Sequence, residues 1–277
     1  MQERKTDMGL FGKLFEKKEC SICGGEIKLL GNRKLEDGNL CKDCARKLSP
    51  WFDDRRHSTV EQIAAQLEYR EANKEKVAAF CTTRTIGLDM KVLLDEDNGR
   101  FMVTDASRLA EANPDVIDFS DVTGCEFKIE DDRDELMREN ADGEEESYDP
   151  PRYEHNYDFY ITIHVNHPYF DEIDFQLNSS SIVLEERSGH NGATIRFGGT
   201  ALNFGSGGFD PMNNQEYRQY KEMGEEIKAV FEQARAQVRE EKTMAEMPKT
   251  PVRCPYCGAQ TMPDENGCCE YCSSALR

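Results

Sequence analysis

Hydrophobic residues recur at helical spacing in two separate stretches of the chain. The first follows Ser58-Thr-Val-Glu61, a capping-box pattern that marks the start of a helix. Its apolar residues return every third or fourth position, which predicts a helix over residues 58–80. The second stretch lies within residues 213–241 and carries an apolar stripe made of Tyr217, Tyr220, Ile227, Val230, Phe231, Ala234 and Val238. We expect this helix to cover a sheet, with pairing to another chain as the alternative.

Between the two helices the hydrophobic period changes to two, which is typical of strands. The segment "KVLLDEDNGRFMVTD" predicts a hairpin with Asn98-Gly99 as a two-residue turn. In "CEFKIE" the residues Cys125, Phe127 and Ile129 share one face, so Cys125 is predicted to be a small core residue, as is Cys81. The segments "YDFYITIHV" and "EIDFQL" alternate in the same way and predict two facing antiparallel strands.

The order of these elements predicts an α+β protein with a β-rich centre. About six or seven antiparallel strands closed by one helix give an antiparallel β-barrel or sandwich. This order is similar to that of bacterial pleckstrin-homology-like domains, a likeness of fold that carries no ligand with it. The expected organisation is a leader over 1–18, a cysteine ribbon over 19–56, a linker helix over 57–80, the β-rich domain with its helix over 81–242, a linker over 243–252 and a second ribbon over 253–277.

Cysteine pairs near both ends carry the chemistry of the chain. Cys20 and Cys23 form one C-x-x-C pair, and Cys41 and Cys44 form a second. Two residues between thiols allow a tight turn to direct both sulfurs at one ion, and "NRKLEDGN" suits a hairpin that brings the second pair back. We therefore predict a structural zinc ribbon with four thiolate ligands.

The C-terminal segment "CPYCGAQTMPDENGCCEYC" has five cysteines for one four-ligand site. Cys254 and Cys257 form the first pair, and the usual spacing selects Cys269 with Cys272 as the second. A register that uses Cys268 instead stays open. Four thiolates saturate a Zn²⁺ ion, so both predicted sites are structural and leave no coordination position for a substrate.

Charge and composition limit the classes of partner. The formal net charge is −19, which disfavours broad binding to nucleic acid or anionic lipid. Residues 115–149 hold 15 Asp/Glu and 3 Lys/Arg, which we interpret as a solvated acidic loop. The sequence contains neither an apolar run long enough to span a membrane nor a secretory signal, so we expect a cytosolic protein with reduced thiols.

The start of the chain has the pattern of a short amphipathic helix. Its apolar face contains Leu10, Phe11, Leu14 and Phe15, and Lys13, Lys17 and Lys18 lie beside it. This pattern suits a peripheral contact with the inner face of an anionic membrane. Docking of the same face onto protein is the alternative.

The segment "MGLFGKLFEKKECSICGGEIKLLGNRKLEDGNLCKDCARKLSPWF" closely resembles the N-terminal segment of a bacterial zinc-ribbon family, domain of unknown function 4428. The later segments "NHPYFDEI", "EYRQYKEMGEEI" and "CPYCG…CCEYC" resemble the longer members of that family. The resemblance implies zinc binding through Cys20, Cys23, Cys41 and Cys44. It implies no activity.

These observations favour a non-enzymatic adaptor with two structural zinc ions and a protein partner. The alternative is a nucleic-acid-associated protein, which requires a basic, aromatic stripe. Basic residues for such a stripe are available in the first ribbon: Lys28, Arg33, Lys34, Lys42, Arg46 and Lys47. The acidic centre opposes this alternative, and the sequence shows no combination of nucleophile, base and orienting group that would indicate an enzyme.

Overall fold

The computed structural model describes residues 18–28, 30–186, 193–197, 200–204, 209–246, 251–264 and 267–276. The chain divides into two units, Met1–Gln233 and Ala234–Arg277. The apolar leader with Leu10, Phe11, Leu14 and Phe15 lies outside the described residues, so its membrane contact stays a prediction. Within the described ranges, none of the helices combines the length and the apolar character needed to cross a membrane.

One four-stranded antiparallel sheet in the first unit follows the order of the chain. It contains β5 (Arg84–Ile86), β6 (Lys91–Asp95), β7 (Arg100–Thr104) and β8 (Ile117–Asp118). The predicted hairpin is confirmed, but its turn is longer than expected. Asp95 pairs with Arg100, so residues 96–99 form the connection. They comprise a single 3₁₀ turn, Glu96–Asn98, and Gly99, whose φ of 64° lies in the left-handed region that favours glycine.

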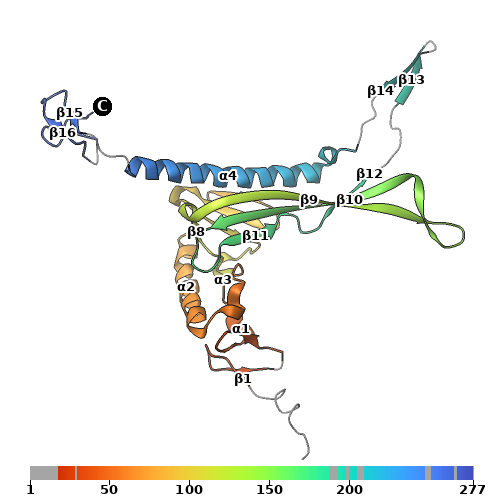
Figure 1. Ribbon diagram of the computed structural model, residues 1–277, viewed down its shortest axis with the longest axis horizontal. Helices are drawn as coiled ribbons and strands as arrows, with labels where there is room; N and C mark the ends of the chain where they lie inside the picture. Colours follow the sequence, from red (N-terminus) through yellow and green to blue (C-terminus); the bar gives the residue numbers. More distant parts are fainter. Residues whose placement is uncertain are drawn as a thin grey trace, which may run out of the picture. The chain divides into compact units, whose positions relative to one another are not determined.

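A second four-stranded sheet is built around one long strand. β10 (Glu145–Val165) pairs along most of its length with β9 (Val122–Glu139). Its other edge is shared by β11 (Glu172–Gln176) and β12 (Ile182–Glu186), which pair with different parts of β10. The far end of the β9–β10 hairpin extends beyond these neighbours (Figure 1). The interpretation of residues 115–149 as an acidic loop was therefore wrong, because most of them form strands.

The capping box of helix α2 (Val60–Ala78) begins at Thr59, one residue later than predicted. Thr59 is the N-cap, and its side chain accepts a hydrogen bond from the backbone N–H of Gln62. The Gln62 carboxamide in turn accepts from the backbone N–H of Thr59, which completes the capping box. The sequence satisfies the same pattern at Ser58 and Glu61, so the motif alone could not decide between the two registers.

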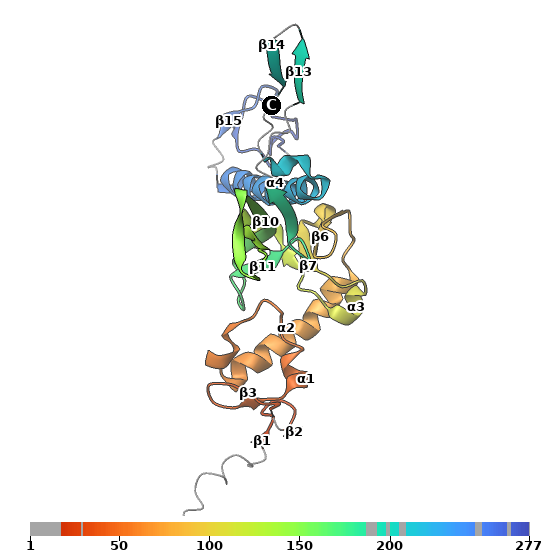
Figure 2. The ribbon, with the colours of Figure 1, turned by 90° about the vertical axis from the view of Figure 1, so that its right-hand side faces the viewer.

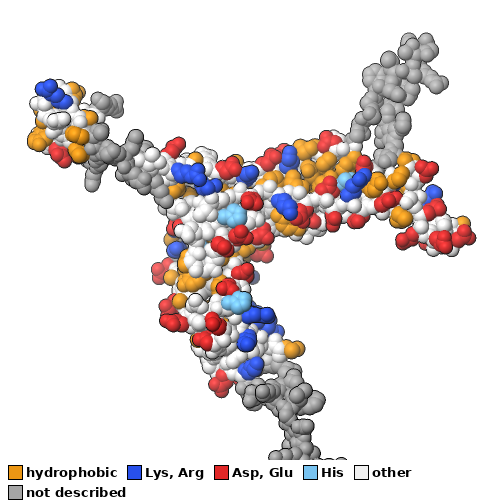
Figure 3. Space-filling model, in the orientation of Figure 1, with side chains coloured by type: hydrophobic (Ala, Val, Ile, Leu, Met, Phe, Trp, Pro, Cys, Tyr) orange, Lys and Arg blue, Asp and Glu red, His pale blue; other side chains and the backbone are white. Residues whose placement is uncertain are grey.

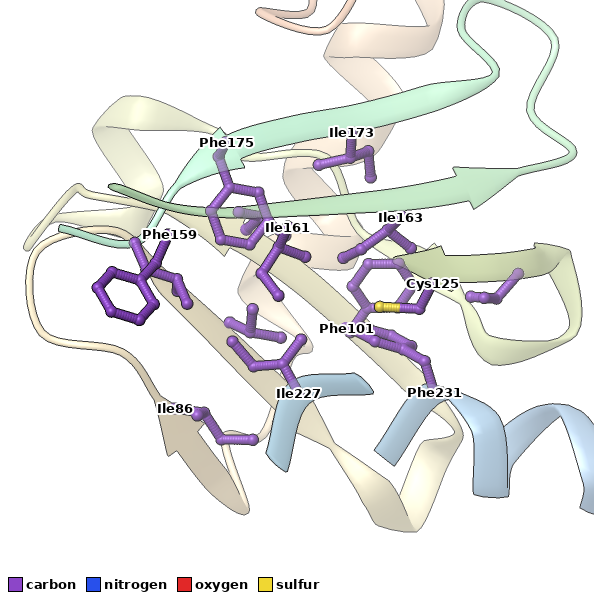
Figure 4. Close-up of a cluster of buried hydrophobic side chains, with 14 of the residues drawn as sticks. Ile86, Phe101, Cys125, Phe159, Ile161, Ile163, Ile173, Phe175, Ile227 and Phe231 are labelled. Carbon is purple, nitrogen blue, oxygen red and sulfur yellow. The ribbon is translucent and has the colours of Figure 1, made fainter. Parts of the chain in front are cut away.

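The main hydrophobic core lies between the two sheets and the helix α4 (Gln215–Glu246). Alternate residues of both sheets face it, which explains the period of two in the sequence. Ile227 and Phe231 of α4 are fully buried, and Figure 4 shows them among side chains from the strands. Where α4 crosses β9, a Cβ atom on Gly224 would lie 2.1 Å from the Phe127 ring, so only glycine permits this approach.

The two sheets do not close into a barrel. The described strands form separate sheets, in which β8 pairs only with β7 and β9 pairs only with β10. A barrel encloses its core by closing one sheet on itself. Here helix α4 supplies part of the core instead. The expected α+β class is confirmed as a mixed helix and sheet protein, whereas the pleckstrin-homology-like barrel is not observed among the described strands.

A buried polar network connects α2 to the segment before β8. The Arg70 guanidinium donates to Asp115 Oδ1 at 2.6 Å, and the two side chains are 7% and 0% exposed. Ser49 Oγ also donates to Asp115, at 2.8 Å. Asn73 donates to the backbone carbonyl of Pro114 at 2.7 Å. Figures 1 and 2 show α2 between the N-terminal residues and the sheets, so this network joins the two parts of the unit.

Short elements complete the fold. Two-residue strands form three pairs, and a separate hairpin follows β12. A short helix, α3 (Leu109–Ala112), precedes β8. The pairs are β1 (Lys18–Glu19) with β2 (Glu26–Ile27), β3 (Arg33–Lys34) with β4 (Asn39–Leu40), and β15 (Val252–Arg253) with β16 (Gln260–Thr261). The hairpin is formed by β13 (Ala193–Phe197) and β14 (Thr200–Phe204). Single 3₁₀ turns span Asp54–His57, Phe119–Asp121 and Pro211–Asn213.

Candidate metal centres

The first cysteine pair lies on a tight backbone turn. The Gly24 N–H donates to the Cys20 carbonyl at 2.8 Å, and the Cys20 N–H donates to the Gly25 carbonyl at 2.9 Å. Gly24 adopts a φ of 69°, a conformation that residues with a side chain rarely take. The sequence Cys-x-x-Cys-Gly-Gly therefore folds into a turn that presents both sulfurs on one side.

The second pair is held by a short helix and not by a second turn of the kind that the first pair forms. Helix α1 (Lys42–Ala45) begins directly after Cys41 and contains Cys44. The Cys41 sulfur acts as the N-cap and accepts a hydrogen bond from the Cys44 N–H at 3.4 Å. The Cys41 N–H donates to the Cys20 sulfur at 3.3 Å, so a backbone amide of the second pair stabilises negative charge on the first.

Hydrophobic packing surrounds this N-terminal site. Cys20 and Cys44 are 2% and 4% exposed and belong to a cluster with α2. The other buried members of the cluster are Ile27, Leu35, Leu40, Leu48 and Ile63. We call residues 18–57 the N-terminal module. The site is thus part of a small core that includes a residue from the first turn of α2.

The C-terminal site, in residues 251–276, is built from two similar turns. In the first, Gly258 N–H donates to the Cys254 carbonyl at 2.9 Å, and in the second, Ser273 N–H donates to the Cys269 carbonyl at 2.8 Å. The residue after each pair is left-handed, with φ of 71° at Gly258 and 56° at Ser273. The structure brings Cys269 into the quartet and leaves Cys268 outside it, as the spacing predicts.

We call residues 251–276 the C-terminal module, and its packing is different. Cys254 and Cys269 are each 1% exposed, but none of the hydrophobic clusters among the described residues includes a residue of this module. Its large side chains face solvent instead. Tyr256 is 74% exposed and Tyr271 is 71% exposed.

Both quartets have the dimensions that a tetrahedral zinc site requires. Four thiolates at about 2.3 Å from Zn²⁺ are about 3.8 Å from one another. Among the Sγ–Sγ distances are 3.8 Å for Cys23 and Cys41, 3.5 Å for Cys254 and Cys272, and 3.7 Å for Cys257 and Cys269. In each group all four sulfurs lie within 4.8 Å of one another. The two groups can therefore each hold one metal ion, and the donor sets fit zinc.

The protonation of the thiols also fits cation binding. Burial raises the pKa of Cys20, but backbone N–H groups of Cys23, Cys41 and Ile22 outweigh this effect and lower it to about 6. Hydrogen bonds from Ser274 lower the pKa of Cys272 to about 6. In each group the surrounding hydrogen bonds therefore favour the thiolate form of one cysteine, and a cation would favour ionisation of the others.

The remaining candidate residues do not add a third site. Cys125 is buried in the main core, which confirms that prediction, whereas Cys81 is exposed and was wrongly assigned to a core. Three histidines lie close together in the sequence, His155, His164 and His167, and they have separate partners. His155 Nδ1 is 2.7 Å from Asp131, His164 lies beside two glutamates, and His167 stacks on Phe170. Among the described residues, only the two cysteine quartets form metal-binding groups.

The exposed tyrosines of the C-terminal module were not predicted from the sequence. Tyr256 occurs in Cys-Pro-Tyr-Cys and Tyr271 in Cys-Glu-Tyr-Cys, so each directly precedes the second cysteine of its turn. This repeat was visible in the sequence. What it could not show is that both rings are exposed and that the described residues of the module form no hydrophobic cluster around them.

The comparison with family models supports part of the resemblance. A model described as domain of unknown function (DUF4428) matches residues 18–66, which cover the whole N-terminal module and the start of α2. No curated protein and no solved structure matches the chain.

Proposed function

We propose that this protein is a non-enzymatic, zinc-binding adaptor whose C-terminal module contacts a protein partner. The observation that carries the proposal is the exposure of Tyr256 and Tyr271 on the two turns of one cysteine quartet. Tyrosine offers a large apolar area with few rotatable bonds and is enriched at protein interfaces. A quartet that holds both turns would keep the two rings in fixed positions.

The metal ions have a structural role in this proposal. Zinc would be held by Cys20, Cys23, Cys41 and Cys44 in one site and by Cys254, Cys257, Cys269 and Cys272 in the other. When bound, it supplies a cross-link between the turns. Four protein ligands complete its coordination, so the residues around each site bind and orient the chain and move no proton. Elemental analysis of the purified protein should find two zinc ions per chain.

Eight cysteines come together in two groups with metal-site dimensions, which supports our proposal of a reducing, cytosolic location. Binding of nucleic acid has less support. The basic side chains of the N-terminal module are exposed or half-buried. Its tryptophan and phenylalanine, Trp51 and Phe52, pack against hydrophobic clusters. Stacking on bases requires accessible aromatic faces.

The test compares partners captured by three forms of the zinc-loaded protein. These are the wild type, Tyr256→Ser/Tyr271→Ser, and Val183→Ser as a matched control, since Val183 is 52% exposed on the other unit. We expect at least one protein to be recovered with the wild type and the control and to decrease at least tenfold with the double variant. Equal recovery by all three forms would remove the tyrosines from any interface.

A further inference from the structure

The two turns of the C-terminal quartet are closed by backbone hydrogen bonds. In the first turn, the Gly258 N–H donates to the Cys254 carbonyl at 2.9 Å. In the second, the Cys269 N–H donates to the Ser274 carbonyl at the same distance. Such bonds add little net stability, because the same groups bind water when the chain unfolds. Since the described residues of this module belong to none of the hydrophobic clusters, the turns lack an apolar core that would hold them together without an ion.

The N-terminal quartet has contacts that bring its two cysteine pairs together without an ion. Leu40, next to the second pair, and Ile63 of α2 are both 0% exposed and lie in one hydrophobic cluster with two of the ligands. Asp37, between β3 and β4, accepts a hydrogen bond from the backbone N–H of Val60 at 2.7 Å. The segment between the two cysteine pairs is therefore attached to α2. Part of this site can form before a metal ion binds.

The ligands of the two quartets also differ in their access to solvent. Cys257 and Cys272 of the C-terminal quartet are both exposed, whereas in the N-terminal quartet Cys23 is exposed and Cys41 is half-buried. A competing ligand in solution can therefore reach two sulfurs of the C-terminal site directly. The other sulfurs of either site become accessible when the module opens locally, and opening costs more where hydrophobic contacts must break. Zinc should thus leave the C-terminal site more easily.

Each exposed tyrosine of the C-terminal module is adjacent to one of these exposed ligands. Tyr256 directly precedes Cys257, and Tyr271 directly precedes Cys272. Figure 3 shows hydrophobic side chains at the surface of this module. The positions of the two rings relative to each other depend on the two turns, and the turns depend on the ion. A surface made of both rings therefore exists only while the ion is bound.

We propose that the C-terminal quartet exchanges zinc with the solution at free zinc concentrations at which the N-terminal quartet stays loaded, so that the tyrosine surface forms in response to zinc. This inference rests on the proposed function, because it takes zinc as the ion and the two tyrosines as the contact surface. Only the folded fraction of a module presents all four sulfurs together, so a module that must fold in order to bind has the weaker apparent affinity.

The test measures zinc occupancy and hydrogen exchange on the same samples of the full-length protein. The protein is dialysed under reducing conditions against chelator buffers that set the free zinc concentration in a series of steps. Elemental analysis gives the zinc bound per chain, and mass spectrometry of the exchanged peptides reports on the two modules separately. Cys23→Ser and Cys257→Ser are matched variants, because each removes one exposed ligand from one quartet.

We expect the wild type to lose its zinc in two steps, whose midpoints in free zinc concentration differ by at least about tenfold. Peptides of the C-terminal module should lose protection in the weaker step, and those of the N-terminal module only in the tighter one. Cys257→Ser should change only the weaker step, and Cys23→Ser only the tighter step. A single step, or earlier loss of protection in the N-terminal module, would overturn the inference. So would C-terminal peptides that stay protected after their zinc has left, and the wild type alone shows this even where a variant does not fold.

The double variant Tyr256→Ser/Tyr271→Ser separates a failure of this inference from a failure of the proposed function. It keeps all eight ligands, and both rings are exposed, so its two midpoints should match those of the wild type within about twofold. A larger shift of the weaker midpoint would mean that the rings stabilise the module itself, which would overturn their assignment to a zinc-dependent surface. If partner capture does not depend on the tyrosines, the proposed function fails, whereas two separate midpoints would still establish the exchangeable C-terminal site.

Discussion

The two cysteine quartets have the same ligands and nearly the same sulfur geometry, but they differ in what surrounds them. The N-terminal site lies within a hydrophobic cluster that includes Leu40 and Ile63, both 0% exposed. The C-terminal site has no such cluster among the described residues. A metal ion would therefore reinforce an existing core in the first module, whereas it would be the main source of order in the second.

The third position of the C-x-x-C turns shows the consequence for function. In the N-terminal turn this residue is Ile22, which packs against the hydrophobic cluster. In the C-terminal turns it is Tyr256 or Tyr271, and both rings are exposed. The same turn thus supplies a core residue in one module and a surface residue in the other. Where the described residues of a module form no hydrophobic cluster, these apolar rings stay at the surface.

Removal of zinc should give the largest difference between the modules. Chelation should abolish the fold of the C-terminal module, because structural zinc contributes about 10–16 kcal/mol of apparent binding free energy and no cluster replaces it. The N-terminal module should retain part of its protection through Leu40 and Ile63. Hydrogen exchange measured by mass spectrometry, with and without chelator, distinguishes the two responses.

The control for this experiment restores zinc in excess and should return both exchange patterns. Equal loss of protection in both modules would contradict the comparison, because it would mean that the hydrophobic cluster gives the N-terminal site no independent order. Replacement of Cys257 by Ser should reproduce the effect of chelation in the C-terminal module alone.

The next largest effect is expected where the N-terminal module joins the sheets. Arg70→Ala should reduce the free energy of unfolding by about 3–5 kcal/mol, because it leaves the buried Asp115 without its cation. Urea denaturation of the zinc-loaded protein measures this change. The double change Arg70→Met/Asp115→Leu should recover most of the loss, since it removes both charges from the interior. If the single variant were as stable as the wild type, the network would not hold the module in place.

A smaller effect is expected from truncating apolar residues within each module. Leu40→Ala should destabilise the N-terminal module by about 2–5 kcal/mol, because a fully buried side chain leaves a cavity. Met262→Ala, at a position that is 45% exposed in the C-terminal module, should change stability by less than about 0.5 kcal/mol. Denaturant unfolding with zinc present measures both changes. Similar losses of stability at the two positions would contradict the difference in packing between the two modules.

The local parts of this structure were predictable from the sequence, and the long-range parts were not. Cysteine spacing predicted both quartets and selected Cys269, and alternation predicted the strands that border the core. The far end of the β9–β10 hairpin was missed because Asp131 to Arg138 have no apolar alternation. Both faces of that segment meet solvent, so burial leaves no pattern in the sequence. The contact between Arg70 and Asp115 joins residues far apart in the chain, and no local signal indicates it.

The smallest effect is predicted for substitutions at the residue with left-handed backbone that follows each C-terminal C-x-x-C turn. Gly258→Ala should weaken zinc binding about fivefold, because the left-handed backbone costs a residue with a Cβ roughly 1–2 kcal/mol, while no atom lies within 4 Å of the new methyl group. Ser273→Gly should strengthen binding by up to a similar factor. Competition with a fluorescent chelator measures both, because folding of this module is coupled to metal binding. Gly24→Ala should change zinc affinity less, since the hydrophobic cluster orders part of that module before the ion binds; an equal or larger change at Gly24 would contradict the difference between the two sites.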